Sequence, residues 1–239
     1  FITGSMKWDA ARPDADPARA HAAAEELASN LGIDRARPLV VAGSTAEGEE
    51  ALLHASVPAG AQLLCAPRKP ERFDEAAAAL PGCVRRSARK GAGPLSPAGG
   101  GGGRFLLDTL GELRAAYALA DVVVIGRTFA PLGGSDPIEP AALGKPVVVG
   151  PSVENFATIV DTLARGGGVV RATRDTLPGL LRDLLADGAR RAAMAKAGPE
   201  VVRAEQGATA RHADLLLSLL DERRPASGAV GATKPDAVA

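Results

Sequence analysis

The residues best suited to bind an anionic ligand lie in a glycine-rich segment, residues 126–139. This segment follows the apolar run 121–125 and contains the pair Gly133-Gly134 before Glu139. Paired glycines let a ligand approach the backbone closely, and the Glu139 carboxylate can accept hydrogen bonds from a ribose diol. The alternative is that Glu139 only complements the dipole of a helix that starts there. Because the acid lies between two prolines in a Gly-rich loop after a strand, we favour ligand binding.

Two hydroxyl side chains follow a second apolar run, residues 38–43. Ser44 and Thr45 come directly after that run, and Glu47, Glu49 and Glu50 come next. Backbone N–H groups and hydroxyls at a helix start can hold an anion or a carboxylate. The spacing alone favours a simpler interpretation, in which the hydroxyls cap the helix and the acids match its dipole.

The segment 67–72 follows a third apolar run, residues 62–66, and contains three cations: Arg68, Lys69 and Arg72. Guanidinium groups match the oxygens of phosphates and carboxylates. A solvated loop in which Arg72 faces Glu71 explains the same residues equally well, so the sequence leaves both interpretations open.

Other common catalytic patterns are not evident. The sequence has no Gly-x-x-x-x-Gly-Lys-Ser/Thr motif, so a P-loop is not supported. His21, His54 and His212 share no spacing that would form a metal cluster or a catalytic dyad. We expect Trp8 and Tyr117 to be packing residues rather than stacking platforms.

The composition is that of a globular domain. The chain has 239 residues, 46% of them hydrophobic and 23% charged. Lys plus Arg and Asp plus Glu both number 28, which argues against a mainly electrostatic nucleic-acid binder. Cys65 and Cys83 lie in apolar runs and are expected to be reduced, as in a cytosolic protein. No apolar run reaches the roughly 18–20 residues that a membrane span needs.

Apolar runs alternate with helical patterns along the chain, which predicts an α/β fold with a doubly wound, Rossmann-like parallel sheet. One helix has a clear start and stop, with Asp16 as its cap, Pro17 at its first position and Gly32 after its end. The expected strands are 38–43, 62–66, 83–88, 104–108, 121–125, 146–149 and 169–171, and the expected helices include 17–31, 73–80, 109–120, 154–165, 174–187, 189–204 and 208–222. In the helix 109–120 one face is expected to bury Leu110, Leu113, Ala116, Tyr117 and Ala120.

The loops that follow the strands carry most of the chemistry. Ligands in parallel α/β sheets bind at the carboxyl ends of the strands. The loops expected there are 43–47, 67–72, 108–112, 126–139 and 150–155. The sequence therefore predicts one site at this edge of the sheet.

The chain is expected to divide into three parts. Residues 1–16 form a junction with an N-terminal domain that lies outside this sequence, because the chain starts without Met and with the end of a strand. Residues 17–222 form the Rossmann-like domain, with a flexible Gly-rich loop at 90–103. Residues 223–239 are rich in Pro, Ala, Gly and Ser and are expected to be disordered.

Five motifs together resemble a known family. AGSTAEGEE, PRKPERF, LLDTLGEL, GGSDPIEPAALGKPVVVGP and ENF occur in the order and spacing seen in the 3-deoxy-D-manno-octulosonic acid (Kdo) transferases of lipopolysaccharide synthesis. The chain resembles the C-terminal half of that family from Phe1 to about Leu220, and ITGSMKWD resembles its domain junction. The resemblance implies a GT-B glycosyltransferase, in which two Rossmann-like domains face each other across a cleft.

The resemblance also implies that the two domains have different roles. The C-terminal domain of the family binds the donor CMP-Kdo, without a metal or cofactor. The N-terminal domain holds the lipid A precursor, a membrane anchor and the catalytic acidic base, which places the full-length enzyme at the cytoplasmic face of the inner membrane. This chain alone is therefore expected to be soluble and inactive. Glu139 would hold the ribose and Lys7 would face the cleft; the residues around the nucleotide and sugar carboxylate would be Ser44, Thr45, Arg68, Gly111, Glu112, Gly133, Gly134, Glu139 and Asn155.

The chain departs from the family at several positions. The family usually has Asn where Ser5 stands, His at Ala46 and Lys69, and His-Asn at Ser135-Asp136. The carboxylate of Asp136 puts negative charge where an anionic donor would lie, which is unfavourable unless Lys69 or Arg127 pairs with it. A donor other than CMP-Kdo, such as a UDP-sugar, is the first alternative. A divergent nucleotide-sugar-binding module without catalytic activity is the second.

Overall fold

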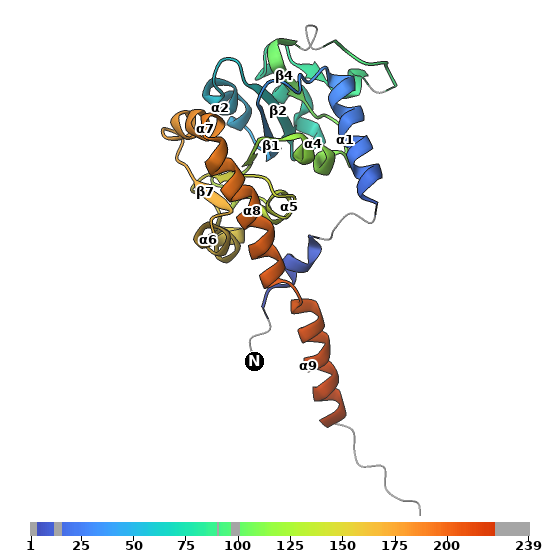
Figure 1. Cartoon of the computed structure of the whole chain (residues 1–239), viewed down its shortest axis with the longest axis vertical. Helices are drawn as coiled ribbons and strands as arrows, with labels where there is room; N and C mark the ends of the chain where they lie inside the picture. Colours follow the sequence, from blue (N-terminus) through green and yellow to red (C-terminus); the bar gives the residue numbers. More distant parts are fainter. Residues whose placement is uncertain (1–3, 12–15, 90, 97–100, 223–239) are drawn as a thin grey trace, which may run out of the picture.

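The computed structural model describes residues 4–11, 16–89, 91–96 and 101–222. Within these residues, seven parallel strands form one sheet in the order β3-β4-β2-β1-β5-β6-β7 (Figure 1). The strands are β1 (Leu39–Thr45), β2 (Gln62–Pro67), β3 (Val84–Arg85), β4 (Arg104–Leu106), β5 (Val122–Ile125), β6 (Val147–Val149) and β7 (Val169–Arg171). The strand order reverses between β1 and β5. The predicted doubly wound parallel sheet is confirmed.

The central strands are apolar along their whole length because both faces of the sheet are covered. Val41 and Val123 point into the core on one face, whereas Val40 and Val124 point into the core on the other. Strands β1 and β5 pair in parallel, with Val41 opposite Val123. This alternation fixes the register of the two strands between which the order reverses.

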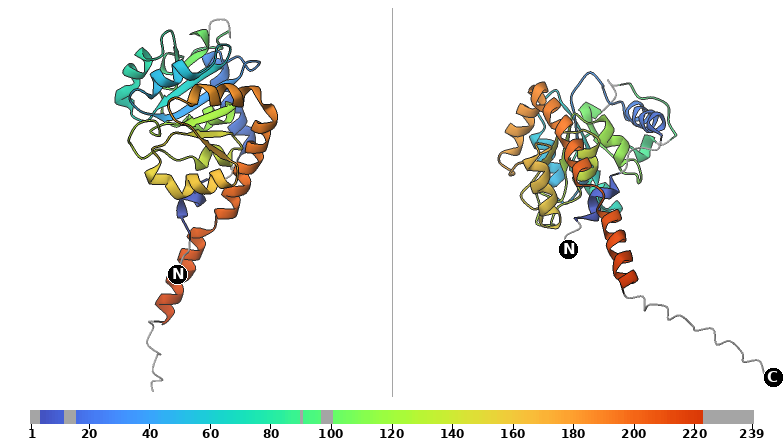
Figure 2. Two further views of the ribbon diagram at one scale, coloured as in Figure 1. Left: turned by 90° about the vertical axis from the view of Figure 1, so that its left-hand side faces the viewer. Right: turned by 60° about the horizontal axis from the view of Figure 1, so that its bottom comes forward.

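Helices cover both faces of the sheet (Figures 1 and 2). One core receives side chains from α1 (Pro17–Leu31), α4 (Leu113–Leu119), α5 (Ile138–Ala142) and α6 (Ala157–Arg165). The other receives side chains from α2 (Glu49–Ser56), α3 (Phe73–Ala78) and α7 (Leu177–Ala186). Helix α8 (Gly188–Glu205) serves both, because Met194 packs in the second core and Val202 in the first.

The start and end of α1 follow the sequence signals. The Asp16 carboxylate accepts a hydrogen bond from the Arg19 N–H at 3.0 Å, and Pro17 is the first helical residue. Gly32 ends the helix in the left-handed conformation, with φ of 71°, which glycine adopts without steric cost. The predicted boundaries of this helix are confirmed.

Two predicted elements differ most from the structure. The helix expected at 109–120 begins only at Leu113, because Gly111 before it has φ of 86°. Leu110 is therefore 79% exposed, and its placement on the buried face is wrong. The strand expected at 83–88 is limited to Val84–Arg85, and a 3₁₀ turn (Ser87–Arg89) follows it.

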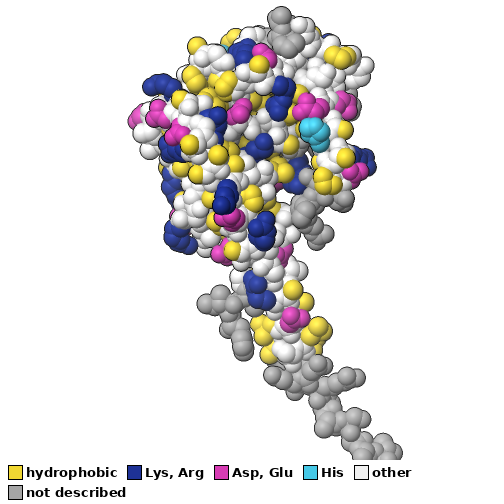
Figure 3. Space-filling view, viewed as in Figure 1, with side chains coloured by type: hydrophobic (Ala, Val, Ile, Leu, Met, Phe, Trp, Pro, Cys, Tyr) yellow, Lys and Arg dark blue, Asp and Glu magenta, His cyan; other side chains and the backbone are white. Residues whose placement is uncertain are grey.

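Helix α9 (Ala208–Glu222) projects away from the body of the molecule (Figures 1 and 2). Its start is held by η1 (Met6–Ala10), where the Asp9 carboxylate accepts N–H hydrogen bonds from Gly207 and Thr209 at 2.6 and 2.7 Å. Further along, apolar side chains face solvent (Figure 3); Leu216, Leu217, Leu219 and Leu220 are exposed. None of the described helices is long and apolar enough to span a bilayer.

Several predictions fall on residues that are not described. They concern residues 1–3 of the strand end expected at 1–4, residues 90 and 97–100 of the Gly-rich segment, and the tail at 223–239 that is expected to be disordered. The division of the chain at 16 and 222 remains a prediction.

Candidate functional site

A cavity of about 360 Å³ lies at the carboxyl ends of β1, β2 and β5, where the strand order reverses. This is the edge at which parallel α/β sheets bind ligands. Its walls come from the end of β1, the loops after β2 and β5, the helices α4 and α5, and the turn η6 (Glu154–Phe156): Ser44, Arg68, Leu113, Tyr117, Arg127, Gly134, Ser135, Asp136, Glu139 and Phe156. The structure thus brings together four of the predicted residues, Ser44, Arg68, Gly134 and Glu139.

The end of β1 and the loop after β5 cross closely beside the cavity. A Cβ atom on Gly126 would lie 2.6 Å from the Cα of Thr45 and would overlap the carbonyl of Ser44. On either side of this crossing, Ser44 and Arg127 adopt left-handed backbone conformations, with φ of 59° and 63°. Such conformations are uncommon outside glycine and cluster at functional sites.

The buried carboxylate of Glu49 ties the two loops together. It is 1% exposed and accepts hydrogen bonds from the N–H groups of Ala46, Arg127 and Phe129 at 2.8, 2.7 and 2.9 Å. Burial raises the pKa of Glu49, although these three hydrogen bonds oppose the shift. Helix α2 starts at Glu49 after Gly48, without a side-chain cap, so the interpretation of the preceding hydroxyls as a helix cap is wrong.

Glu50 ties the same loop to the segment after β2. Its buried carboxylate accepts the hydroxyl of Thr45 at 2.7 Å and two hydrogen bonds from Arg72 at 3.0 and 3.1 Å. The side chain of Thr45 is fully buried, so this predicted residue supports the loop and does not line the cavity. Of the three predicted cations only Arg68 lines the cavity; Arg72 pairs with Glu50 and Glu75 rather than with Glu71.

Glu139 lies in the first turn of α5 and faces the cavity. Its carboxylate accepts a hydrogen bond from Arg114 at 3.1 Å and stays partly exposed. Beneath it, Tyr117 is 3% exposed; burial and the charge of Glu139 raise the pKa of its phenol. The Tyr117 hydroxyl occupies the space that a Cβ on Gly43 would need, so Tyr117 packs as predicted and also forms a wall of the cavity.

Asp136 contributes a second acid to the cavity. Its carboxylate accepts the N–H of Ile138 at 2.8 Å. Loss of hydration raises the pKa of Asp136, and Glu139 adds to that shift, while the Ile138 N–H and the charge of Lys7 oppose it. Among the described hydrogen bonds and ion pairs, none joins Asp136 to Lys69 or Arg127.

Gly133, Asn155 and Lys7 lie together beside the cavity rather than on its walls. Gly133 has φ of 74°, and a Cβ there would overlap the Asn155 amide. The Asn155 N–H donates to the Gly133 carbonyl at 3.1 Å, which joins the loops after β5 and β6. Lys7 donates to the Asn155 carbonyl at 3.0 Å and lies over the Phe156 ring at 4.3 Å. The cation predicted to face the cleft is thus held next to the cavity.

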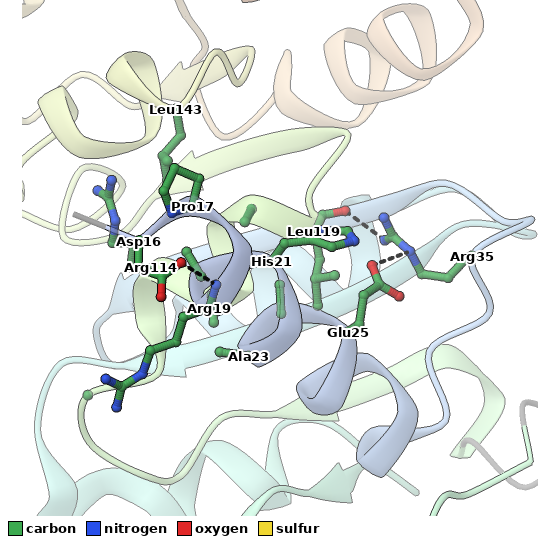
Figure 4. A pocket seen from close by; sticks show the side chains of 15 residues that line it. Asp16, Pro17, Arg19, His21, Ala23, Glu25, Arg35, Arg114, Leu119 and Leu143 are labelled. Atoms are coloured by element: carbon green, nitrogen blue, oxygen red, sulfur yellow. Dashed lines mark hydrogen bonds and ion pairs between the residues drawn. The ribbon is translucent and has the colours of Figure 1, made fainter. Parts of the chain in front are cut away.

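Gly111 lines a different cavity, of about 700 Å³, between α1 and α4 (Figure 4). Arg114 also lines it and pairs with Glu139, so this side chain links the two cavities. Glu112 lies elsewhere: it accepts two hydrogen bonds from the buried Arg86, at 2.8 and 3.0 Å, and one from the Thr109 hydroxyl. A donor-binding role for Gly111 and Glu112 remains a prediction.

Comparison with known proteins identifies the family. No family model matches the chain. A 3-deoxy-D-manno-octulosonic acid transferase from Bordetella pertussis is 39% identical over 226 residues, which cover 90% of this chain and 50% of the relative. One from Haemophilus influenzae is 32% identical over 197 residues, or 77% of this chain and 45% of the relative. The C-terminal CMP-Kdo binding domain of WaaA from Acinetobacter baumannii matches with a TM-score of 0.67 at 26% identity, covering 77% of this chain and 98% of that domain.

The chain belongs to the Kdo transferase family. The resemblance drawn from the five motifs is confirmed, and so is the GT-B class of fold. The chain spans about half the length of the curated Kdo transferases that it matches, 50% and 45%.

The Kdo transferase cavity also contains residues that the sequence analysis did not assign to the site. Arg127 lies two residues after the strand 121–125, just as Arg68 lies two residues after the strand 62–66, so its position carries the same signal. Leu113, Tyr117 and Phe156 carry no comparable signal, because they reach the cavity through helix packing.

The chemical character of the cavity is clear from these side chains. The guanidinium groups of Arg68 and Arg127 can bind phosphate or carboxylate oxygens, and Glu139 can accept hydrogen bonds from hydroxyls. In the part of the chain that the structure describes, no group of three or more His, Cys, Asp or Glu is arranged to hold a metal ion. The arrangement fits a ligand that carries anions and a diol.

Proposed function

We propose that this chain is the donor-binding domain of a Kdo transferase and that it binds CMP-Kdo in the 360 Å³ cavity. The main support is the convergence of Arg68, Arg127 and Glu139 on one cavity where the strand order reverses. CMP-Kdo carries a phosphate and a sugar carboxylate, which match two guanidinium groups. Its ribose diol matches the Glu139 carboxylate. The name of the Acinetobacter domain, which states CMP-Kdo binding, agrees with this proposal.

The proposed reaction is an attack by an acceptor hydroxyl on the anomeric carbon of Kdo, with the phosphate of CMP as the leaving group. Cations that face the cavity would stabilise the charge that develops on this phosphate. The acceptor, a lipid A precursor, and the acidic base would come from the part of the enzyme outside this chain, at the cytoplasmic face of the inner membrane. We therefore expect residues 1–239 alone not to transfer Kdo; transfer to a lipid A precursor by this chain would contradict the division of labour.

Nucleotide titration tests the donor. Calorimetry with CMP, CDP, UMP and UDP is expected to show the tightest binding for a cytidine nucleotide. The variant Glu139→Ala should weaken that binding about tenfold or more, because the carboxylate that would hold the ribose is lost. Unchanged affinity in this variant would favour a binding module whose site lies elsewhere.

One observation favours a second candidate, a transferase for another nucleotide sugar. Asp136 places a carboxylate in the cavity, and no described ion pair neutralises it. The charge of Lys7 offsets it only in part. Tight binding of UDP together with no binding of CMP would reject CMP-Kdo and support a UDP-sugar donor.

A further inference from the structure

The conformation of Arg127 is unusual for a residue with a long side chain. Arg127 has φ of 63°, a conformation that glycine adopts freely and an L-residue adopts at a cost. Its side chain lines the cavity together with Arg68. The Arg127 guanidinium donates to the Leu132 carbonyl at 3.0 Å, and this one hydrogen bond among the described residues leaves further N–H donors of the fork for a ligand.

The backbone of Arg127 is held by one distant side chain. Glu49, 78 positions earlier in the sequence, accepts the Arg127 N–H at 2.7 Å. The same carboxylate accepts the Phe129 N–H at 2.9 Å and the Ala46 N–H at 2.8 Å. It therefore holds the backbone of Arg127 on one side and that of Ala46, two residues after the left-handed Ser44, on the other.

A carboxylate suits this task better than any other side chain. An ionised carboxylate only accepts hydrogen bonds and has about four lone-pair sites, so it can take three N–H groups at once. The amide of a glutamine has the same shape, but its NH₂ group would face a backbone N–H. A buried N–H left without an acceptor is costly, so the loop is expected to rearrange in Glu49→Gln.

We infer that Arg127 binds an anionic group of the donor and that Glu49 is a positioning residue, which fixes the Arg127 backbone and so directs its guanidinium into the cavity. This inference rests on the proposed function, because it needs an anionic nucleotide donor. Arg68 and Arg127 then form a pair of cations contributed by the loops after β2 and β5, on either side of β1. Glu49 acts through Arg127 and does not itself contact the donor.

A matched control exists at the other end of the same strand pair. Asp121 precedes β5, and its carboxylate accepts the N–H of Leu39, the first residue of β1, at 2.8 Å. It links the strands that Glu49 links, but it lies at the edge opposite the cavity. Asp121→Asn therefore changes an acid of similar structural role without touching the donor site.

The test is a double-mutant cycle on the 239-residue chain, with CMP and UDP as titrants in calorimetry. Arg127→Gly is expected to weaken nucleotide binding about tenfold, or about 1.4 kcal/mol, while the fold stays intact because glycine accepts the left-handed backbone. Glu49→Gln should weaken binding to a similar extent. The double variant should bind no more than about twofold more weakly than Arg127→Gly, because both changes remove the same interaction. Asp121→Asn should bind as the wild type does.

The outcomes separate this inference from the proposed function. Unchanged affinity in Arg127→Gly removes Arg127 from the site, and fully additive effects in the double variant show that Glu49 does not act through Arg127. If Glu49→Gln does not fold, Arg127→Gly and the charge-preserving Arg127→Lys decide whether the cation is a ligand. A wild type that binds UDP but not CMP refutes the proposed donor, yet the same variants measured with UDP still test Glu49 and Arg127. A wild type that binds neither nucleotide overturns both.

Discussion

At both ends of the β1–β5 pair a carboxylate accepts hydrogen bonds from backbone N–H groups, but the two carboxylates have different roles. At the amino ends the Asp121 carboxylate accepts the Leu39 N–H, and the Asp121 N–H donates to the Leu39 carbonyl at 2.9 Å. At the carboxyl ends the Glu49 carboxylate accepts three N–H groups from two loops. Near Asp121 the backbone continues as ordinary strand, whereas Glu49 lies between two left-handed residues that line a cavity.

The difference shows where this fold accepts unfavourable conformations. The order of the strands reverses between β1 and β5, and the cavity lies at their carboxyl ends. Ser44 and Arg127 have φ values above zero at this end, and the Arg127 N–H is held by Glu49. The following changes compare the two ends, beginning with the largest expected effect.

The close crossing of the loops should make the carboxyl end the more sensitive to added volume. In Gly126→Ala the new Cβ would meet the backbone of Ser44 and Thr45, and backbone cannot move aside as a side chain can. We expect a loss of about 3 kcal/mol in the free energy of unfolding, measured by urea denaturation. Gly60→Ala is the control before β2, where φ is 90° and no atom lies within 4 Å of the new Cβ. It should lose only about 1–2 kcal/mol, and equal losses would contradict the comparison.

The two carboxylates should differ in how well they tolerate an amide. Asp121→Asn keeps one oxygen for the one N–H that needs it, so its loss in unfolding free energy should stay below about 1 kcal/mol. Glu49→Gln leaves at least one buried N–H without an acceptor and should lose about 2 kcal/mol. Circular dichroism during urea titration measures both values. A larger loss in Asp121→Asn would show that Glu49 contributes less to the carboxyl end than its geometry indicates.

Two acids at the carboxyl end, Asp108 and Glu49, should contribute to stability with opposite dependence on pH. Hydrogen bonds from Ser87 and Arg85 outweigh burial and hold the pKa of Asp108 below its ordinary value of 3.8. The stability from Asp108 is therefore present above that value and is lost as pH falls through the lowered pKa. Burial raises the pKa of Glu49 above 4.5, so its contribution is present below that value and is lost as pH rises through the raised pKa.

The free energy of unfolding, measured at about pH 3 and about pH 7, shows whether the contribution of each acid rises or falls with pH. The stability difference between wild type and Asp108→Asn should grow with pH. The stability difference between wild type and Glu49→Gln should shrink as pH rises. If both stability differences change with pH in the same direction, one of the two pKa shifts is opposite to the one stated here.

The smallest effect is expected in the loop after β4. Leu110 is 79% exposed, so Leu110→Ala should change the free energy of unfolding by less than about 0.5 kcal/mol. Leu107→Ala, three residues earlier and 2% exposed, should lose about 2–4 kcal/mol. Similar losses for the two would show that Leu110 is buried after all. Thermal or urea unfolding of the two variants distinguishes these outcomes.

Much of the fold could be predicted because its signals are local. The strand 121–125 and the helix that starts at Pro17 are read from apolar runs, a cap and a terminal glycine. The carboxyl edge followed from the alternation of strands and helices, which indicates a parallel sheet, and Arg68 and Glu139 were found by their place after strands. Leu110 was misplaced because a helical spacing of apolar residues continues through Gly111, whose positive φ starts the helix later.

The rest of the site depends on contacts between distant parts of the chain. Glu49 bonds residues 78 and 80 positions away, and Glu112 bonds Arg86, which is 26 positions away. A glutamate that caps a helix and a glutamate that joins two loops look the same in one sequence. Thr45 was placed in the site for a similar reason, since only the fold shows that Glu50 takes its hydroxyl.

The position of Trp8 gives the molecule an intrinsic optical label. Trp8 is the one tryptophan in the sequence, and it is 3% exposed within η1. Its carbonyl accepts a hydrogen bond from Gln206 at 3.2 Å, just before α9 begins. Its fluorescence therefore reports on the junction between η1 and α9, next to Lys7 and outside the cavity. A change in emission on adding nucleotide would signal movement of that junction, whereas binding confined to the cavity would leave the emission unchanged.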